Sequence, residues 1–165
     1  KGVSVGYSCF VIKSDGTLWG WGSNAGDLGN NTSSGAVSSP IQIGSDTNWA
    51  SLNSDAVQNQ SHLAIRSTGT LWGWGWNGNG ELGIDSALGY RSSPTQVGTD
   101  TNWSIAYPGG SGLKTNGTLW TWGNNFYGNL GNNSTSNSLS PIQVGTAANW
   151  STLWDCGQQK FAVAT

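Results

Sequence analysis

One pattern, Gly-Thr-Leu-Trp-x-Trp-Gly, occurs three times in this chain and constrains its fold more than any other feature. The copies span residues 16–22, 69–75 and 117–123. The period is therefore roughly 50 residues, which is typical of propellers, solenoids and other arrays in which no unit buries its apolar face alone. We expect a repeat protein, and such chains act more often as binding surfaces than as reaction centres.

Each repeat contains four short segments with the alternation or apolar character of β-strands. In the second repeat we expect them at Trp49–Leu52, His62–Ile65, Thr70–Trp74 and Thr95–Val97. A polar loop precedes the fourth segment and ends at a proline. These loops are expected at residues 30–39, 84–93 and 132–140. Between the second and third segments, Asp15-Gly16 and Asn116-Gly117 predict hairpins with type I′ turns, which need positive φ at both central residues.

The third segment of each repeat is apolar on both faces. In the first copy Trp19 and Trp21 point one way, while Leu18 and Gly20 point the other way. Such a strand is buried on both sides, as when sheets stack face to face around an axis. No segment has helical periodicity, so we predict an all-β chain of four-stranded antiparallel β-propeller blades.

The repeats divide a single domain into units at residues 1–48, 49–102 and 103–149, with a half-repeat at 150–165. This gives about 3.5 blades, whereas propellers typically close with four to eight. Either the chain is part of a longer, seven-bladed propeller, or copies assemble into a ring or filament. The chain begins with Lys and has no Met, which indicates a processed product or a fragment.

The composition excludes several classes of partner. Only 8% of residues are charged, the net charge is −2 and no basic cluster occurs, so nucleic-acid binding through phosphates is not expected. No apolar run approaches the roughly 20 residues of a membrane span. The polar, charge-poor composition favours an extracellular or cell-surface setting. Cys9 and Cys156 lie near opposite ends and are either separate thiols or a disulfide at a seam.

Residues able to support catalysis or metal binding are scarce. His62 is the only histidine, and we interpret it as a strand residue with a hydrogen bond. The oxygens of Asn77, Asn79, Glu81 and Asp85 hint at a calcium loop, but their spacing is wrong for an EF-hand. No nucleophile elbow is present. We therefore expect no enzyme, no cofactor and no metal.

The repeated tryptophans are interpreted as core residues, whereas aromatic residues that break the repeat are candidates for partner binding. The fold does not need them, and aromatic residues often dominate binding energy. The alternative is incidental packing within loops. The candidates are Trp76, Tyr90, Phe126, Tyr127 and Trp154.

The run Trp-Gly-x-Asn-x-x-Gly-x-Leu-Gly at residues 74–83 and 122–131, one residue shorter at 21–29, resembles the repeat of the regulator of chromosome condensation (RCC1-like) family. The resemblance implies a seven-bladed propeller, and bacterial members are most similar in polarity. We hypothesise a non-enzymatic protein-interaction or scaffold module. The alternatives are a structural subunit that self-assembles through its half-blade ends and a lectin-like glycan-binding propeller.

Overall fold

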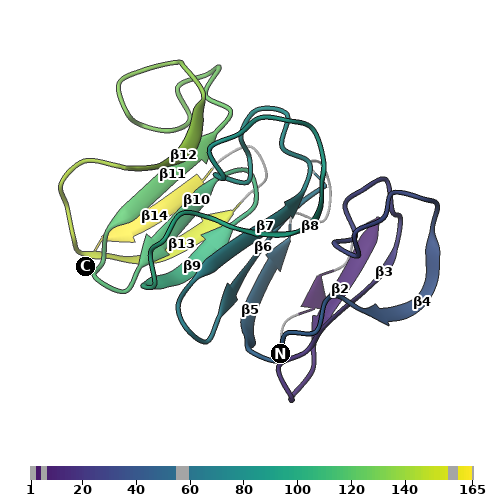
Figure 1. The fold of residues 1–165 in the computed structure, drawn as a ribbon. Helices are drawn as coiled ribbons and strands as arrows, with labels where there is room; N and C mark the ends of the chain where they lie inside the picture. Colours follow the sequence, from purple (N-terminus) through teal and green to yellow (C-terminus); the bar gives the residue numbers. More distant parts are fainter. Residues whose placement is uncertain (1–2, 5–6, 55–59, 156–159, 165) are drawn as a thin grey trace.

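The computed structural model describes residues 3–4, 7–54, 60–155 and 160–164, and its regular structure is entirely β-strand. Consecutive strands form three four-stranded antiparallel sheets and one two-stranded sheet. Figure 1 shows these sheets standing side by side in chain order, from the purple N-terminal blade to the yellow C-terminal half-blade. The predicted all-β class and the count of about three and a half blades are confirmed.

The strand bounds are as follows. The first blade contains β1 (Val3–Ser4), β2 (Ser8–Ile12), β3 (Leu18–Gly22) and β4 (Val37–Gln42). The second contains β5 (Trp49–Ser54), β6 (Ser61–Arg66), β7 (Leu71–Gly75) and β8 (Arg91–Gln96). The third contains β9 (Trp103–Tyr107), β10 (Ser111–Lys114), β11 (Leu119–Gly123) and β12 (Ser138–Gln143). The half-blade contains β13 (Trp150–Asp155) and β14 (Lys160–Ala164). Within the described ranges, no helix is long and apolar enough to span a membrane.

The hairpin between the second and third strands of each blade is present, but its predicted turn type is wrong. The Gly16 N–H donates to the Lys13 carbonyl and the Lys13 N–H donates to the Thr17 carbonyl, both at 3.0 Å. Gly16 has a φ of 81°, whereas Asp15 is not among the residues with positive φ. Only the glycine is left-handed, as in a longer hairpin loop that closes with a glycine bulge.

The same glycine joins one blade to the next. The Trp49 N–H, at the start of the second blade, donates to the Gly16 carbonyl at 3.1 Å. A Cβ atom at Gly16 would collide with the Thr47 carbonyl. Gly69 and Gly117 make the equivalent contacts with the segments that enter the following sheets. The glycine of the repeated motif is therefore required by a close approach between blades.

The fourth strand of each blade begins earlier than predicted and runs through its proline. The strands start at Val37, Arg91 and Ser138 rather than after the polar loops. Each is the outer strand of its sheet, and each proline lies where the register with the third strand shifts. Proline is tolerated at edge strands and bulges because it has no ladder hydrogen bond to lose. The prolines are Pro40, Pro94 and Pro141.

The core lies between the blades. Trp74 of β7 packs in a cluster with Phe10, Leu28 and Ile43 of the first blade. Trp122 of β11 does the same with residues of the second blade. Both tryptophans have no exposed surface, so the interpretation of the repeated tryptophans as core is confirmed for these two copies.

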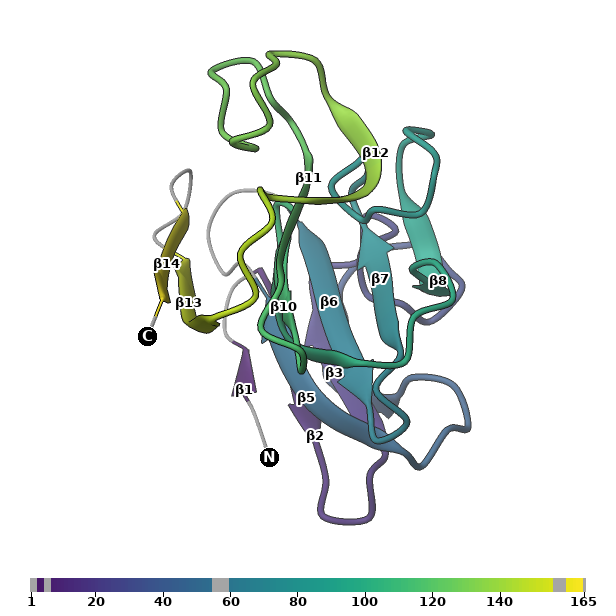
Figure 2. The ribbon, with the colours of Figure 1, turned by 90° about the vertical axis from the view of Figure 1, so that its left-hand side faces the viewer.

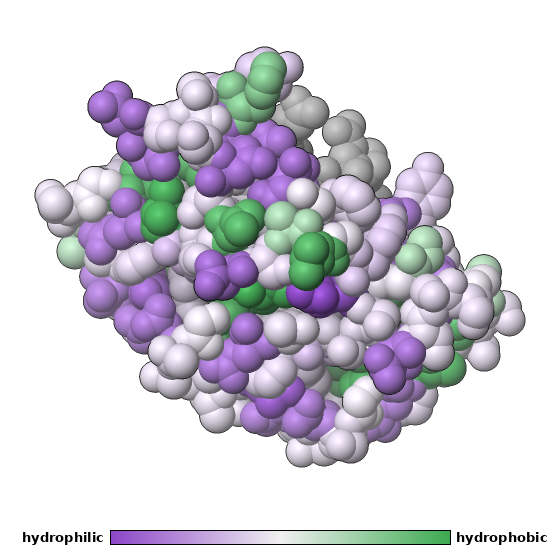
Figure 3. All heavy atoms as spheres, turned by 45° about the horizontal axis from the view of Figure 1, so that its top comes forward, coloured by the Kyte–Doolittle hydropathy of each residue, from purple (hydrophilic) through white to green (hydrophobic). Residues whose placement is uncertain are grey.

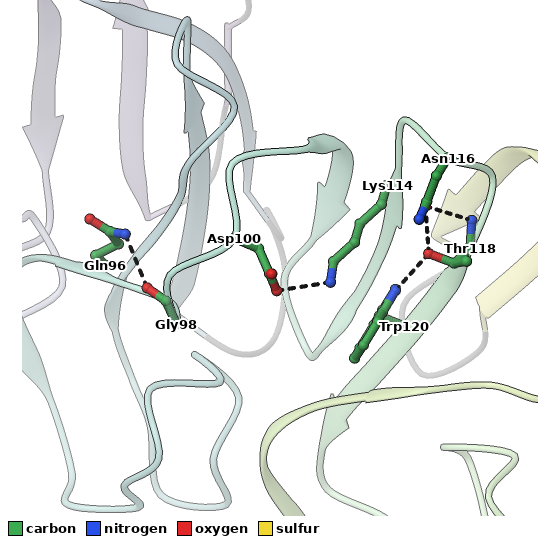
Figure 4. Close-up of polar contacts among 7 residues, drawn as sticks. All are labelled: Gln96, Gly98, Asp100, Lys114, Asn116, Thr118 and Trp120. Atoms are coloured by element: carbon green, nitrogen blue, oxygen red, sulfur yellow. Dashed lines mark hydrogen bonds and ion pairs between the residues drawn. The ribbon is translucent and has the colours of Figure 1, made fainter.

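Polar contacts hold the segment that connects two blades against the second strand of the later blade (Figure 4). Lys114 of β10 pairs with Asp100 at 2.8 Å, and its amino group lies 3.5 Å from the ring centroid of Trp120. The Trp120 indole N–H donates to Thr118 Oγ1, which in turn donates to Asn116, both at 2.8 Å. The threonine and first tryptophan of the motif thus serve the structure. Arg66, Asp46 and Trp72 form the corresponding arrangement in the second blade.

Candidate functional site

The loops after the third strands are polar in sequence but are held by buried asparagines. Asn125 has no exposed surface, and its Oδ1 accepts the Leu130 N–H at 2.9 Å. Its Nδ2 donates to the carbonyls of Ser134 and Ser136, each at 2.9 Å. Asn77 holds the preceding loop in the same manner. These buried bonds give each loop a defined conformation.

The first two of these loops are also pinned to the next blade. The Asn31 N–H donates to the Ser92 carbonyl at 2.7 Å, and the Asp85 N–H donates to the Leu139 carbonyl at 2.9 Å. Both donors have left-handed backbones, with φ of 62° and 57°. Figures 1 and 2 show the loops that follow β7 and β11 together at the upper end of the blades. The loops after β3 and β7 are therefore fixed against the next blade by a backbone hydrogen bond.

Two of the predicted aromatic residues, Trp76 and Tyr90, form one pair on the β7–β8 loop. Their ring centroids lie 5.1 Å apart in an edge-to-face arrangement. Trp76 is half-buried, and Tyr90 is 36% exposed. The Tyr90 hydroxyl donates to Gln60, and burial raises the pKa of that hydroxyl. Tyr90 thus holds the loop near the start of β6.

Phe126 and Tyr127 form a second pair at the tip of the β11–β12 loop. The rings meet edge to face with centroids 4.9 Å apart, and the residues are 71% and 81% exposed. Their backbone is fixed by Asn125 and by Asn124, whose Oδ1 accepts the Phe126 N–H at 3.1 Å. The fold thus displays two large aromatic side chains that it does not use for packing.

An exposed apolar residue on the β7–β8 loop was not predicted. Leu88, within the polar β7–β8 loop, is 74% exposed; its only signal in the sequence is an apolar side chain two residues before Tyr90. Trp154 lies in β13, but its side chain is outside the described part. Figure 3 looks onto the loop-bearing side and shows green apolar groups separated by purple and white residues. The surface is mixed rather than uniformly apolar.

His62 is a packing residue at the interface of the first two blades. Its ring contacts those of Phe10 and Trp74, with centroid distances of 4.5 and 5.7 Å, and those two rings also contact each other. Neither ring nitrogen has a hydrogen-bond partner among the described residues, so the predicted hydrogen bond is wrong. Burial lowers the pKa of His62 to about 3, which leaves the ring neutral at physiological pH.

Of the residues that hinted at a calcium loop, Asn77 and Glu81 use their oxygens within the turn, whereas Asp85 Oδ1 accepts the Ser140 hydroxyl of the next blade at 3.2 Å. Asn77 Oδ1 accepts the Leu82 N–H at 2.9 Å, and the Glu81 carboxylate accepts the N–H and the Nδ2 of Asn79, both at 2.8 Å. In the described ranges no three His, Cys, Asp or Glu side chains converge as metal ligands would. Asn77 and Glu81 therefore serve the turn.

The structure describes only one of the two cysteines. Cys9 lies half-buried in β2, whereas Cys156 lies outside the described residues. A seam disulfide therefore stays a prediction.

Comparison with known proteins identifies the repeat. Residues 116–162 match the family model described as the regulator of chromosome condensation (RCC1) repeat. No curated protein sequence matches the chain.

Solved structures with the same fold include human WBSCR16, with a TM-score of 0.70 and 22% identity over 88% of this chain and 39% of that chain. Prp20p from Saccharomyces cerevisiae has a TM-score of 0.73 and 19% identity over 91% of this chain and 40% of that chain. A chain in the structure of Kap60 bound to yeast RCC1 (Prp20) has a TM-score of 0.75 and 20% identity over 100% of this chain and 42% of that chain. This chain thus spans about two fifths of the length of these proteins. Residues 116–162 carry an RCC1 repeat, and the chain as a whole has the blade fold of the RCC1 propellers.

Proposed function

We propose that this chain is a non-enzymatic protein-interaction or scaffold module that binds its partner through the loops after β7 and β11. The observation that carries this proposal is the exposed pair of Phe126 and Tyr127 on a loop held by buried hydrogen bonds. Rigid aromatic side chains bury a large area on binding with little loss of conformational freedom, and they are frequent hot spots.

The solved structures support a protein as the partner. Prp20p from Saccharomyces cerevisiae has binding properties to Gsp1p and histones, and yeast RCC1 (Prp20) has been solved with Kap60 bound to it. These are statements about the yeast protein. For the present chain they favour the class of partner, namely a protein, and not its identity.

The test is quantitative capture with three purified chains: the wild type, the double variant Phe126→Ala/Tyr127→Ala, and Tyr7→Ala as a matched control. Tyr7 is also an exposed aromatic residue, at 75%, but lies between β1 and β2. We expect the wild type and the control to capture the same partner from an extract of the source organism. The amount captured by the double variant should be lower by about tenfold or more. Equal capture by all three chains would contradict the loop assignment.

Exposed aromatic rings also suit stacking on sugars, so the same three chains are applied to a glycan array. If the wild type binds a glycan and the double variant does not, the partner is a glycan and not a protein. If no chain binds any glycan, the lectin alternative is excluded.

We also propose an extracellular or cell-surface setting, because only 8% of the residues are charged. Fractionation of the source cells with an antibody to this chain tests it, and recovery in the cytosol alone contradicts it.

A further inference from the structure

A groove of about 500 Å³ lies between the first and second blades. Its walls come from the β3–β4 loop, from the segment that joins β4 to β5, and from the second blade, including β6, β7 and β8. Sites for small molecules commonly have volumes of about 300–1,000 Å³ and combine apolar walls with a few polar groups. Phe126 and Tyr127, on which the proposed function rests, do not line this groove.

The charged residues that line the groove form one ion pair, between Asp46 and Arg66. Arg66 Nη2 donates to Asp46 Oδ2 at 2.6 Å, and the guanidinium lies 3.7 Å from the ring centroid of Trp72. The side chains of Asp46 and Arg66 are 45% and 15% exposed. A phosphate or a carboxylate would be repelled by Asp46, and a cation would be repelled by Arg66. The groove therefore favours a neutral ligand.

Other polar groups of the groove are available to a ligand. Asn31 and Ser93 are exposed, and their side chains make no hydrogen bond among the described residues. Gln42 donates from Nε2 to the Gly44 carbonyl at 3.1 Å, which leaves its Oε1 as an acceptor. Amide and hydroxyl groups both donate and accept hydrogen bonds. A ligand that matches them must do both, as the hydroxyl groups of a sugar do.

The groove also has apolar walls. Trp72 and Pro94 line it and are half-buried, and Ile43 lines it as a buried residue. The Trp72 indole N–H donates to Thr70 Oγ1 at 3.0 Å, which holds the ring in place. A sugar ring has apolar C–H faces and a polar rim of hydroxyl groups, so it suits a site that combines a fixed aromatic ring with amides.

The equivalent place between the second and third blades is crossed by a side-chain hydrogen bond. Asp85 holds the position of Asn31, and its Oδ1 accepts the hydroxyl of Ser140, which holds the position of Ser93, at 3.2 Å. Ile84 packs beside it against an apolar cluster, whereas the first blade has an asparagine at this position. The supporting residues recur, namely Gln96, Asp100 and Trp120 (Figure 4). The first interface thus keeps free the groups that the second interface bonds to each other.

We propose that the groove between the first and second blades binds a neutral sugar. Asn31, Asp46 and Ser93 bind its hydroxyl groups, and Trp72 contacts the apolar face of a ring. The groups come from both blades, so the packed interface positions them before the ligand arrives. The proposal goes beyond the proposed function, because it uses a groove between blades and not the aromatic side chains of the loops.

An array of neutral, sialylated and sulfated glycans tests the proposal. We expect the wild type to bind neutral glycans and to bind neither of the acidic classes. Titration calorimetry then compares the bound glycan as a free oligosaccharide with the same glycan on its carrier protein. Similar affinities for the two identify the sugar itself as the ligand. Binding of the carrier protein alone overturns the proposal.

Two pairs of variants compare the groove with the equivalent place at the next interface. Asn31→Asp gives the groove the carboxylate that Asp85 supplies beside Ser140, and Asp85→Asn is the matched control. Asp46→Ala removes a hydrogen-bond acceptor from the groove, and Asp100→Ala breaks the equivalent ion pair outside it. We expect Asn31→Asp and Asp46→Ala to weaken binding of the free oligosaccharide by about tenfold or more, and the two controls to bind like the wild type. Circular dichroism shows that each chain is folded.

The double variant Phe126→Ala/Tyr127→Ala separates this proposal from the proposed function. It should keep the sugar, and the groove variants should keep the protein partner in the capture test. A wild type that binds no neutral glycan at millimolar concentration overturns the proposal. So do folded groove variants that bind the sugar like the wild type, or binding that is lost only in the double variant.

Discussion

The two interfaces between the three full blades contain tryptophans at equivalent positions. Only one of the two indole N–H groups has a hydrogen-bond acceptor among the described residues. Between the first and second blades, Trp74 packs against the rings of Phe10 and His62, and its indole N–H has no acceptor among the described residues. Between the second and third blades, the Trp122 indole N–H donates to the Glu81 carbonyl at 2.9 Å. One interface rests on ring contacts, and the other adds a buried hydrogen bond.

The residue opposite each tryptophan also differs. His62 pairs with Trp74 in the register of β6 and β7. The residue at the matching position opposite Trp122 is Gly110, whose carbonyl accepts the backbone N–H of Trp122 at 2.9 Å. A Cβ atom at Gly110 would collide with the Trp122 carbonyl. A repeat can therefore keep its tryptophan while exchanging a packed ring for a close backbone contact.

Removing either tryptophan should have the largest effect on stability. Both side chains are fully buried, so Trp74→Ala and Trp122→Ala should each lower the free energy of unfolding by about 3–5 kcal/mol. Chemical denaturation followed by circular dichroism measures the loss. A loss below about 1 kcal/mol at one position would show that the blade on that side does not depend on the interface.

The second prediction is a pH dependence of stability that arises from His62, at the interface of the first two blades. The pKa of His62 is about 3 in the folded chain because the ring is buried, and it is about 6.5 in an unfolded chain. Above pH 6.5 the ring is neutral in both states and contributes no pH dependence. Below pH 6.5 the unfolded chain takes up a proton that the folded chain does not, so stability falls as the pH decreases toward 3.

The slope due to this one group is about 1.4 kcal/mol per pH unit. Denaturation of wild type and His62→Leu between pH 7 and pH 4 isolates it, because the carboxylates are the same in both chains. The difference in unfolding free energy between the two should shift in favour of the variant as the pH decreases. Parallel curves would contradict the placement of a neutral, buried His62.

The smallest effect is expected from replacing each indole by a phenyl ring. Trp122→Phe leaves the Glu81 carbonyl without its donor and should cost about 1–3 kcal/mol beyond the loss of ring area. Trp74→Phe removes an N–H group that has no acceptor in the described structure, so it should cost only the ring area. Equal losses in the two variants would show that the hydrogen bond contributes nothing.

The sequence predicted the blades because each repeat contains the information locally. Alternation, turn glycines and the spacing of the motif located the four strands of the second blade to within a few residues. The starts of β4, β8 and β12 were missed because a proline ordinarily ends a strand, and its tolerance here depends on lying at a sheet edge opposite a bulge. The turn type was missed because the approach of the next blade, and not the dipeptide, requires the glycine.

The candidate site was predicted in part. Aromatic residues that break the repeat located Phe126 and Tyr127, and the structure places them together in the open. The same reasoning selected Trp76 and Tyr90, which contact each other and are partly buried. It overlooked Leu88, because an apolar residue in a loop is exposed only if no neighbouring blade covers it.

By itself, the sequence determined the period, the strand content and the identity of the group that each blade inserts into the one before it, because all of these follow from local pattern and residue type. The tertiary structure alone decided which tryptophans are covered. Trp74 and Trp122 are buried and Trp21 is not, although the three share one motif. Burial depends on the blade that lies against the tryptophan, and the local pattern and residue type of one repeat do not specify that contact.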